Sequence, residues 1–370
     1  MSGQSFSRRR LLGGAVAAAA VPVLGVGCHR SESARQGGGV TVADLTGATV
    51  ELSHPARRVV TIPLPAAAMM VAVNGGPEVL VGMNAASRSA VEGSFLGTAF
   101  PELRHVSTEV AGAEFAPNVE SVLALDPDVV IQWGDRGPGI VDPLRNAGLA
   151  VAQLSYGTQQ DLEGAVVLYG TLLGKPERAA TMVTWMRERM QSLRNAIPAT
   201  QSGAAPSVLY LRGSADGLEA AGRASYNHYV TELVGGRNAA AEIDAQDASV
   251  DVEQLLRWNP DVILLGNVGP RVPRDFYGDP ALASLRAVQD HRIYKVPLGG
   301  YRWDPPSHES PLMWQWLAGV VHGSRAPGLR ADVVEQYVFW YGVEPTAAQL
   351  DQILHTADNA DSRDYVDFGR

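Results

Sequence analysis

The segment VESVLALDPDVVI at residues 119–131 returns, with the same order of features, as VEQLLRWNPDVIL at residues 252–264. In each copy an apolar helical pattern stops before a proline turn and leads into a run rich in β-branched residues. Such a run is typical of a strand that is buried on both faces, as in a parallel sheet between helices. Units of this kind also recur by chance in α/β proteins, but the shared order favours duplication. The copies lie too far apart for a solenoid, so the repeat predicts two sequential lobes.

Between the two copies, the sequence predicts one long helix. Pro176 stands in the first-turn position that proline tolerates. One apolar stripe then continues at helical spacing until Pro198, and a helix of this length spans about 33 Å. We therefore expect two Rossmann-like α/β lobes with mainly parallel central sheets, at residues 40–160 and 199–370. Linker helices at 161–198 would join them and leave a ligand cleft between the lobes.

The first residues carry the pattern of an export signal. Arginines at positions 8–10 precede a short apolar run and then Cys28, the one cysteine of the chain. The arginines look like a twin-arginine motif, and Cys28 is a candidate lipid attachment site, although Gly25 stands where such sites usually have leucine. We expect a signal peptide at residues 1–28, a flexible tether at 29–39, and a location in the periplasm or on the outer face of the cytoplasmic membrane.

Composition and missing motifs exclude several classes of function. The 370 residues are 46% hydrophobic and 19% charged, which suits an ordered protein with two cores. The formal charge of −9 opposes nucleic-acid binding. Nucleophile elbow, zinc-protease and dinucleotide-binding motifs are missing, and the Gly-rich run at 170–175 has one residue too few for a phosphate loop. We expect no enzyme and no intrinsic cofactor; a surface adhesion or scaffold lipoprotein is one class of function that these observations leave open.

A set of short motifs, in order along the chain, resembles one known family. The motifs are Asp44-Leu45-Thr46-Gly47, Arg58-Val59-Val60, Val81-Gly82-Met83, the two Pro-Asp-Val segments, Leu233-Val234-Gly235-Gly236-Arg237-Asn238 and Arg292-Ile293-Tyr294. Together they resemble the periplasmic binding proteins for iron-siderophore, haem and cobalamin uptake, whose two lobes are joined by a rigid helix. The resemblance runs from about residue 41 to residue 350.

This resemblance implies the exported solute-binding component of an ABC importer. Such a component captures a metal chelate and delivers it to membrane permease subunits, while a separate subunit hydrolyses ATP. We expect a ferric siderophore first, a corrinoid or haem next, and an oxyanion such as molybdate third. The metal would arrive inside its chelator, because no pair of His, Asp or Glu at helical ligand spacing supports a closed metal site in this sequence.

The resemblance also implies two docking residues. In the family, one surface glutamate on each lobe pairs with arginines of the permease, and the matching residues are Glu120 and Glu253. Two exposed carboxylates held apart by a rigid body can select a partner with matching arginines. The alternative is that each is an ordinary solvated residue of a helix face. Equivalent placement in both repeats favours docking.

Candidate ligand contacts follow the strands, because ligands of α/β sheets collect at the carboxyl ends of strands. The run Tyr301-Arg302-Trp303 is the most informative, since it joins a guanidinium that can hold an oxyanion to two flat aromatic donors. For Trp303 the alternative is packing, and for the other arginines, Arg271 included, a surface charge. The remaining candidates are Pro63, Arg88, Trp133, Arg212 and Tyr226.

Several local expectations complete the sequence picture. A loop is expected at residues 85–87 and an amphipathic helix at 314–321. His308 is expected to be a cap or surface residue rather than a metal ligand. The aromatic residues of the tail, such as Tyr337 and Tyr341, are expected to pack without specific chemistry.

Overall fold

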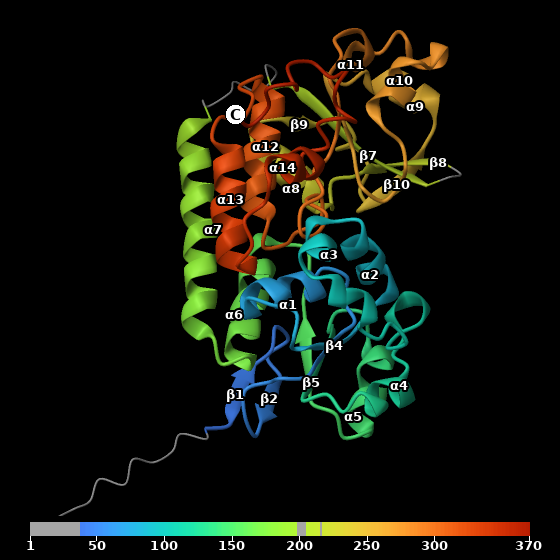
Figure 1. Cartoon of the computed structure of the whole chain (residues 1–370). Coiled ribbons are helices and arrows are strands. Elements are labelled where there is room, and N and C mark those ends of the chain that lie inside the picture. Colours follow the sequence, from blue (N-terminus) through green and yellow to red (C-terminus); the bar gives the residue numbers. More distant parts are fainter. Residues whose placement is uncertain (1–37, 198–204, 215–216) are drawn as a thin grey trace, which may run out of the picture. The chain divides into compact units, whose positions relative to one another are not determined.

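The computed structural model describes residues 38–197, 205–214 and 217–370. Gly38–Arg370 forms one compact unit, and the elements of this unit are shown in Figure 1. The expected signal peptide, Cys28 and most of the tether lie outside the described residues. Within the ranges given, no helix combines the length and the apolar character needed to span a bilayer.

The N-terminal lobe is built on a four-stranded parallel sheet with the order β4-β3-β5-β6. Its strands are β3 (Val59–Thr61), β4 (Leu80–Met83), β5 (Val129–Trp133) and β6 (Val151–Leu154), and a hairpin of β1 (Val40–Ala43) and β2 (Thr49–Leu52) stands apart from it. β3, β5 and β6 are buried along their whole length, as a sheet between helices requires. The helices are α1 (Ala66–Asn74), α2 (Ala85–Glu92), α3 (Phe95–Ala99), α4 (Val119–Ala124), α5 (Asp142–Asn146) and α6 (Gln159–Leu172).

The expected long helix is α7 (Pro176–Ala196), which begins at Pro176 as predicted. Its apolar stripe is buried in the half nearer its start, through Ala179, Met182, Val183 and Met186. α7 packs against α6 and against α12 (Ser310–His322), which comes from the other lobe. In Figure 1 α7 runs alongside α12 and α13 (Leu329–Tyr341). The helix therefore joins the lobes by side-chain packing as well as by the chain itself.

The C-terminal lobe has a second sheet, with the order β10-β8-β7-β11-β12 and β9 paired to β7. β9, β7, β11 and β12 are parallel, whereas β8 and β10 extend the sheet antiparallel. The strands are β7 (Ser207–Ser214), β8 (Gly217–Ala221), β9 (Arg237–Asn238), β10 (Asp247–Val250), β11 (Val262–Leu265) and β12 (Ile293–Lys295). The remaining helices are α8 (Tyr226–Leu233), α9 (Val252–Trp258), α10 (Pro273–Tyr277), α11 (Arg286–Gln289) and α14 (Ala347–Ile353).

The duplicated segments occupy the same place in the two sheets. β5 lies between β3 and β6, and β11 lies between β7 and β12, all in parallel register. The helix before each strand is capped in the same way: Asn118 accepts a hydrogen bond from the backbone of Ser121, and Asp251 accepts one from Gln254. The expectation of two α/β lobes with a connecting helix is confirmed.

Two local expectations are wrong. Residues 85–87 are not a loop but the first turn of α2, because the Asn84 side chain accepts a hydrogen bond from the backbone of Ala86 and caps the helix. The helix expected as amphipathic at 314–321 is α12, which is buried on nearly all sides. α12 contacts α7, α8 and α13, and so it has almost no face left for solvent.

Candidate ligand-binding site

Two loops from opposite lobes approach each other at the carboxyl ends of the two sheets. Tyr156 follows β6 and Tyr301 follows β12. Burial raises the pKa of the Tyr156 phenol well above its usual range, and Tyr301, Tyr226 and Asp304 of the C-terminal lobe raise that pKa further. Pro306 also lines a small cavity of about 20 Å³ together with Tyr156 and other residues of the N-terminal lobe. The junction at Tyr156 and Tyr301 is therefore where the sheets of the two lobes face each other.

The N-terminal side of this junction is an aromatic platform with a cation above it. Trp133, the last residue of β5, meets Tyr156 edge-on with ring centroids 5.2 Å apart. The exposed Arg136 guanidinium lies 5.1 Å from the Trp133 ring centroid and 4.6 Å from that of Phe115. Stacking on two rings holds the guanidinium in place while its N–H groups stay available to an acceptor.

The C-terminal side presents a phenol and a second guanidinium. Burial raises the pKa of Tyr301 to about 12, and the neighbouring Arg302 opposes that rise. Arg302 is half-buried. Among the described residues neither Arg302 nor Arg136 has a carboxylate partner, whereas Arg88 and Arg212 do. The junction thus carries one guanidinium from each lobe that is free of ion pairs in the described ranges.

Asp304 adds an acceptor beneath the junction. Its side chain is buried, and its Oδ2 accepts a hydrogen bond of 2.6 Å from the Tyr210 hydroxyl. Its other oxygen, Oδ1, has no hydrogen-bond partner in the part of the chain that the structure describes. A buried acceptor without a partner is costly. Asp304 also contributes to the raised pKa values of both Tyr156 and Tyr301, so its side chain lies within electrostatic reach of both phenols.

Comparison with known proteins gives the family of this chain. The family model for periplasmic binding proteins matches residues 65–298, more than half of the sequence. The chain belongs to the periplasmic binding protein family. The resemblance found in the sequence is thereby confirmed.

Solved and curated relatives agree with this assignment. A periplasmic solute binding protein from Veillonella parvula is 30% identical, with a TM-score of 0.80 over 87% of this chain and 99% of that chain. The molybdate-bound MolA of Haemophilus influenzae shares the fold, with a TM-score of 0.72 and 19% identity over 83% of this chain and 99% of that chain. A cobalamin-binding protein of Halobacterium salinarum is 30% identical over 232 residues, which are 61% of this chain. The match spans 58% of the length of that relative.

Of the other predicted contact residues of this periplasmic binding protein, the two arginines and Pro63 are engaged by their own lobes, whereas Tyr226 also contacts the other lobe. Arg88 pairs with Glu92, and Arg212 pairs with Glu219 and Asp247. Pro63 is buried between β3 and α1. Tyr226 is buried near the junction, where its hydroxyl contacts Gln159 of α6 and the indole of Trp314. The structure therefore brings Trp133, Tyr226 and Tyr301 close to Tyr156, with Arg302 beside Tyr301, and it engages Arg88 and Arg212 in ion pairs within their own lobes.

Trp303 and His308 face the interior of this binding protein. Trp303 is fully buried, and its indole N–H donates to the carboxylate of Glu309, so it supports the loop from inside. The expectation that His308 is a cap or surface residue is wrong: its side chain is fully buried, and burial lowers its pKa to about 3. The reason is that the tail helix α13 covers this segment, with the Tyr341 hydroxyl 2.6 Å from His308 Nε2. No group of three or more His, Cys, Asp or Glu in the described residues is arranged to hold a metal ion.

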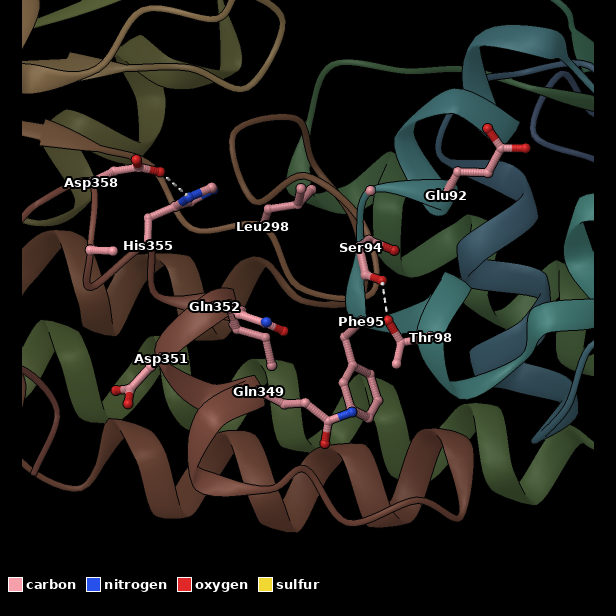
Figure 2. Close-up of a pocket in the computed structure, with 13 residues that line it drawn as sticks. Glu92, Ser94, Phe95, Thr98, Leu298, Gln349, Asp351, Gln352, His355 and Asp358 are labelled. Carbon is pink, nitrogen blue, oxygen red and sulfur yellow. Dashed lines mark hydrogen bonds and ion pairs between the residues drawn. The ribbon is translucent and has the colours of Figure 1, made fainter.

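A larger cavity, of about 450 Å³, lies on the other side of the same loop (Figure 2). Leu298, the α2–α3 connection and α14 line it, and it includes none of the predicted contact residues. Its charged groups already have partners within the fold: Glu92 pairs with Arg88, Asp351 with Arg330, and Asp358 with His355, the last pair drawn as a dashed line in Figure 2. We therefore place the candidate site at the junction of Tyr156 and Tyr301.

The two glutamates expected to dock this binding protein are both exposed. Glu120 lies in the first turn of α4 and Glu253 in the first turn of α9. Each is followed three residues later by an exposed leucine, Leu123 at 45% and Leu256 at 36% of full exposure. The two repeats thus present the same pair of a carboxylate and an apolar side chain to solvent.

Tyr156 and Arg136 escaped the sequence analysis, and Asp304 was reached only as the last residue of the candidate run after the strand. Tyr156 and Arg136 belong to loops whose partners lie in the other lobe, far away in sequence. A signal existed for Asp304, because it directly follows Tyr301-Arg302-Trp303 after a strand. A carboxylate in that run was an equally good candidate for ligand contact.

Proposed function

We propose that this chain is the extracytoplasmic solute-binding component of an ABC importer, which captures a metal chelate and delivers it to the membrane permease. The observation that carries the proposal is the junction itself, where the Tyr156 phenol lies within electrostatic reach of Arg136 on its aromatic platform and of Tyr301 from the other lobe. A ligand held there would contact both lobes at once. Guanidinium groups would pair with its negative charge, and aromatic rings would pack against its flat surface. Membership of the periplasmic binding protein family supports the same function.

Among chelates, Asp304 favours a corrinoid. The amide side chains of a corrinoid are hydrogen-bond donors that suit a negative charge at the junction, whereas a bare oxyanion such as molybdate would be repelled by the carboxylate. The curated relatives that are 30% identical to this chain are named cobalamin-binding proteins. These two lines of support put the corrinoid first.

A ferric siderophore, the expectation from the sequence, remains the second candidate. It is supported by the two guanidiniums of Arg136 and Arg302, which have no carboxylate partner among the described residues and suit an anionic chelate. Haem shares the flat apolar surface of a corrinoid and belongs in the same comparison.

A titration of intrinsic tryptophan fluorescence tests the proposal. The chain has seven tryptophans, and cyanocobalamin, cobinamide, haem, a panel of ferric siderophores and molybdate are the probes. We expect saturable binding of one chelate class with a Kd at or below the micromolar range, about −8 kcal/mol or tighter. Saturable binding of molybdate alone would contradict the chelate assignment. No saturable binding by any probe would favour a surface adhesion or scaffold protein.

The remaining parts of the transport function extend this proposal. Glu120 and Glu253 would dock on the permease, with Leu123 and Leu256 beside them, and a separate subunit would hydrolyse ATP. Export through the twin-arginine signal and lipid attachment at Cys28 would hold the protein at the outer face of the cytoplasmic membrane. Metabolic labelling with a radioactive fatty acid tests the attachment: Cys28→Ser should abolish the label, and a label that persists would move the anchor elsewhere.

A further inference from the structure

Glu309 is a buried carboxylate that receives four hydrogen bonds. Its Oε1 accepts from the backbone N–H of Gly300 at 2.8 Å and from the Tyr341 hydroxyl at 3.0 Å. Its Oε2 accepts from the Trp303 indole and from the Tyr337 hydroxyl, the latter at 3.1 Å. Glu309 itself is fully buried. Four donors fill the acceptor sites of an ionised carboxylate and leave none for a carboxyl proton.

The direction of the neighbouring hydrogen bonds follows from the single proton of each hydroxyl. Tyr341 gives its proton to Glu309, so the contact of 2.6 Å between Tyr341 and His308 requires His308 Nε2 to be the donor. Burial lowers the pKa of His308 to about 3, so the ring is neutral and carries its proton on Nε2. His308 therefore orients Tyr341 towards Glu309 and brings no positive charge.

The loop has glycine at positions 299 and 300 because the Glu309 carboxylate and its donors leave no room for a side chain there. A Cβ atom at Gly299 would collide with Glu309, Tyr337 and Trp303, and one at Gly300 would collide with Tyr341 and Glu309. The same two glycines also bind the N-terminal lobe. The carbonyl of Gly299 accepts from the Phe95 backbone at 2.9 Å, and that of Gly300 accepts from the Ser94 hydroxyl at 3.2 Å.

We propose that Glu309 is a positioning residue for cargo binding. Its ionised carboxylate fixes the loop at residues 298–303, sets Tyr301 and Arg302 in place, and keeps that loop bonded to α3 of the other lobe. The inference rests on the proposed function for its effect on cargo, but the contacts of the loop are independent of any ligand.

Protonation of Glu309 would loosen this arrangement. Burial raises the pKa of Glu309 to about 7 against the four donors that lower it. Of the other titratable groups that contact it, His308 is neutral above pH 3, and Tyr337 and Tyr341 have pKa values well above the usual range. Glu309 is thus the member of this cluster that changes charge near neutral pH. If Glu309 stays buried, its neutral form accepts fewer hydrogen bonds, so the loop loses order as the pH falls, although the same proton stabilises the fold against complete unfolding.

The first test measures the affinity for the chelate that binds most tightly in the fluorescence panel, at pH 6 and pH 8. The fraction of protein that can bind cargo follows the fraction in which Glu309 is ionised. Wild-type affinity should therefore fall by up to about tenfold from pH 8 to pH 6. Glu309→Gln, which keeps the shape, should bind weakly at both pH values without this dependence. Tyr341→Phe removes one donor and serves as a milder second variant, and Glu335→Gln on the exposed face of α13 is the matched control. The same pH dependence in wild type and Glu309→Gln would overturn the inference.

The second test needs no ligand, so it still decides if the proposed function fails. Hydrogen exchange of the full chain is followed in peptides that cover residues 94–100 and 298–303. We expect wild type to lose protection of the Phe95 and Gly300 N–H groups from pH 8 to pH 6, after correction for intrinsic exchange, and Glu309→Gln to lack protection at both. Equal protection in the two proteins at both pH values would overturn the role of Glu309. Absence of binding to every probe would refute the proposed function alone.

Discussion

Asp128 and Asp261 make the same contact in the two lobes. Asp128 Oδ2 accepts hydrogen bonds from the backbone of Arg57 and Arg58, at 2.7 and 3.0 Å, where the chain enters β3. Asp261 Oδ2 accepts one of 2.7 Å from the backbone of Ser207, the first residue of β7. Each aspartate therefore ties the strand that follows it to the neighbouring strand of its sheet. The short helix before each aspartate is fixed to its lobe in an equivalent way.

This equivalence leads to the first prediction, on docking. Glu120 and Glu253 stand eight residues before the two aspartates and are exposed. The double variant Glu120→Arg, Glu253→Arg should abolish importer-dependent uptake, because like charges would meet at both contacts, and should leave the Kd for cargo within about twofold. Uptake in a strain lacking the native protein and fluorescence titration measure the two effects. Glu102→Arg, at another exposed site, is the control; loss of cargo affinity as well would indicate a folding defect.

The second prediction concerns Arg302. Replacement by Ala should weaken binding of an anionic chelate by roughly 1.5–3 kcal/mol, or about tenfold to over a hundredfold, because a charge-assisted hydrogen bond is lost. Arg145→Ala on the exposed face of α5 is the matched control and should leave the Kd unchanged. Fluorescence titration measures both. An unchanged Kd in the Arg302 variant would remove this residue from the site.

The third prediction separates the chelate classes through Asp304. Asp304→Asn keeps the acceptor for the Tyr210 hydroxyl but removes the negative charge at the junction. A corrinoid whose amide donors face this negative charge should bind about tenfold more weakly to this variant. An anionic siderophore should bind as well or more tightly, because a repulsive charge is gone. The ratio of the two affinities, titrated on the same preparation, decides between the classes; a constant ratio would place Asp304 outside the site.

The sequence revealed the architecture because it is repeated and periodic. Two buried strands after Pro-Asp turns and one long apolar stripe each have a distinctive period, so the lobes and α7 could be predicted. α2 was missed because its start is marked by the cap at Asn84, and its residues are small and polar rather than periodic. Only the C-terminal side of the site could be predicted, because its residues around Arg302 form one continuous run in the sequence. Its counterpart Tyr156 and its support Glu309 acquire their roles only through contacts with residues distant in sequence.

The fourth prediction concerns the pH dependence of stability at His308 and Glu309. Glu309 has a folded pKa of about 7 against an ordinary value of 4.5, so its contribution to the free energy of unfolding falls as the pH rises through that window. His308 has a folded pKa of about 3 against 6.5, so its contribution rises with pH between those values. The two effects oppose each other between about pH 4.5 and pH 6.5, where the two windows overlap.

Single variants should expose each effect. When the pH is raised from 5 to 7, the free energy of unfolding of Glu309→Gln should increase by about 2 kcal/mol relative to that of wild type. That of His308→Gln should decrease by about 2 kcal/mol relative to wild type over the same interval. Urea unfolding at both pH values measures these differences. Glu335→Gln is the control and should track wild type. A difference between Glu309→Gln and wild type that does not change with pH would show that Glu309 titrates in its ordinary range in the folded protein.

The last prediction tests the close packing of the loop at Gly299. A methyl group there would overlap the Glu309 carboxylate, the Tyr337 hydroxyl and the Trp303 indole. Gly299→Ala should therefore destabilise the fold by about 1–3 kcal/mol, the usual cost of overpacking, since all three neighbours are buried and cannot move aside cheaply. Gly139→Ala, where a Cβ meets nothing within 4 Å, should change the free energy of unfolding by less than about 0.5 kcal/mol. Urea unfolding at pH 8 compares the two, and equal stability would mean that the backbone at residue 299 can retreat from the carboxylate.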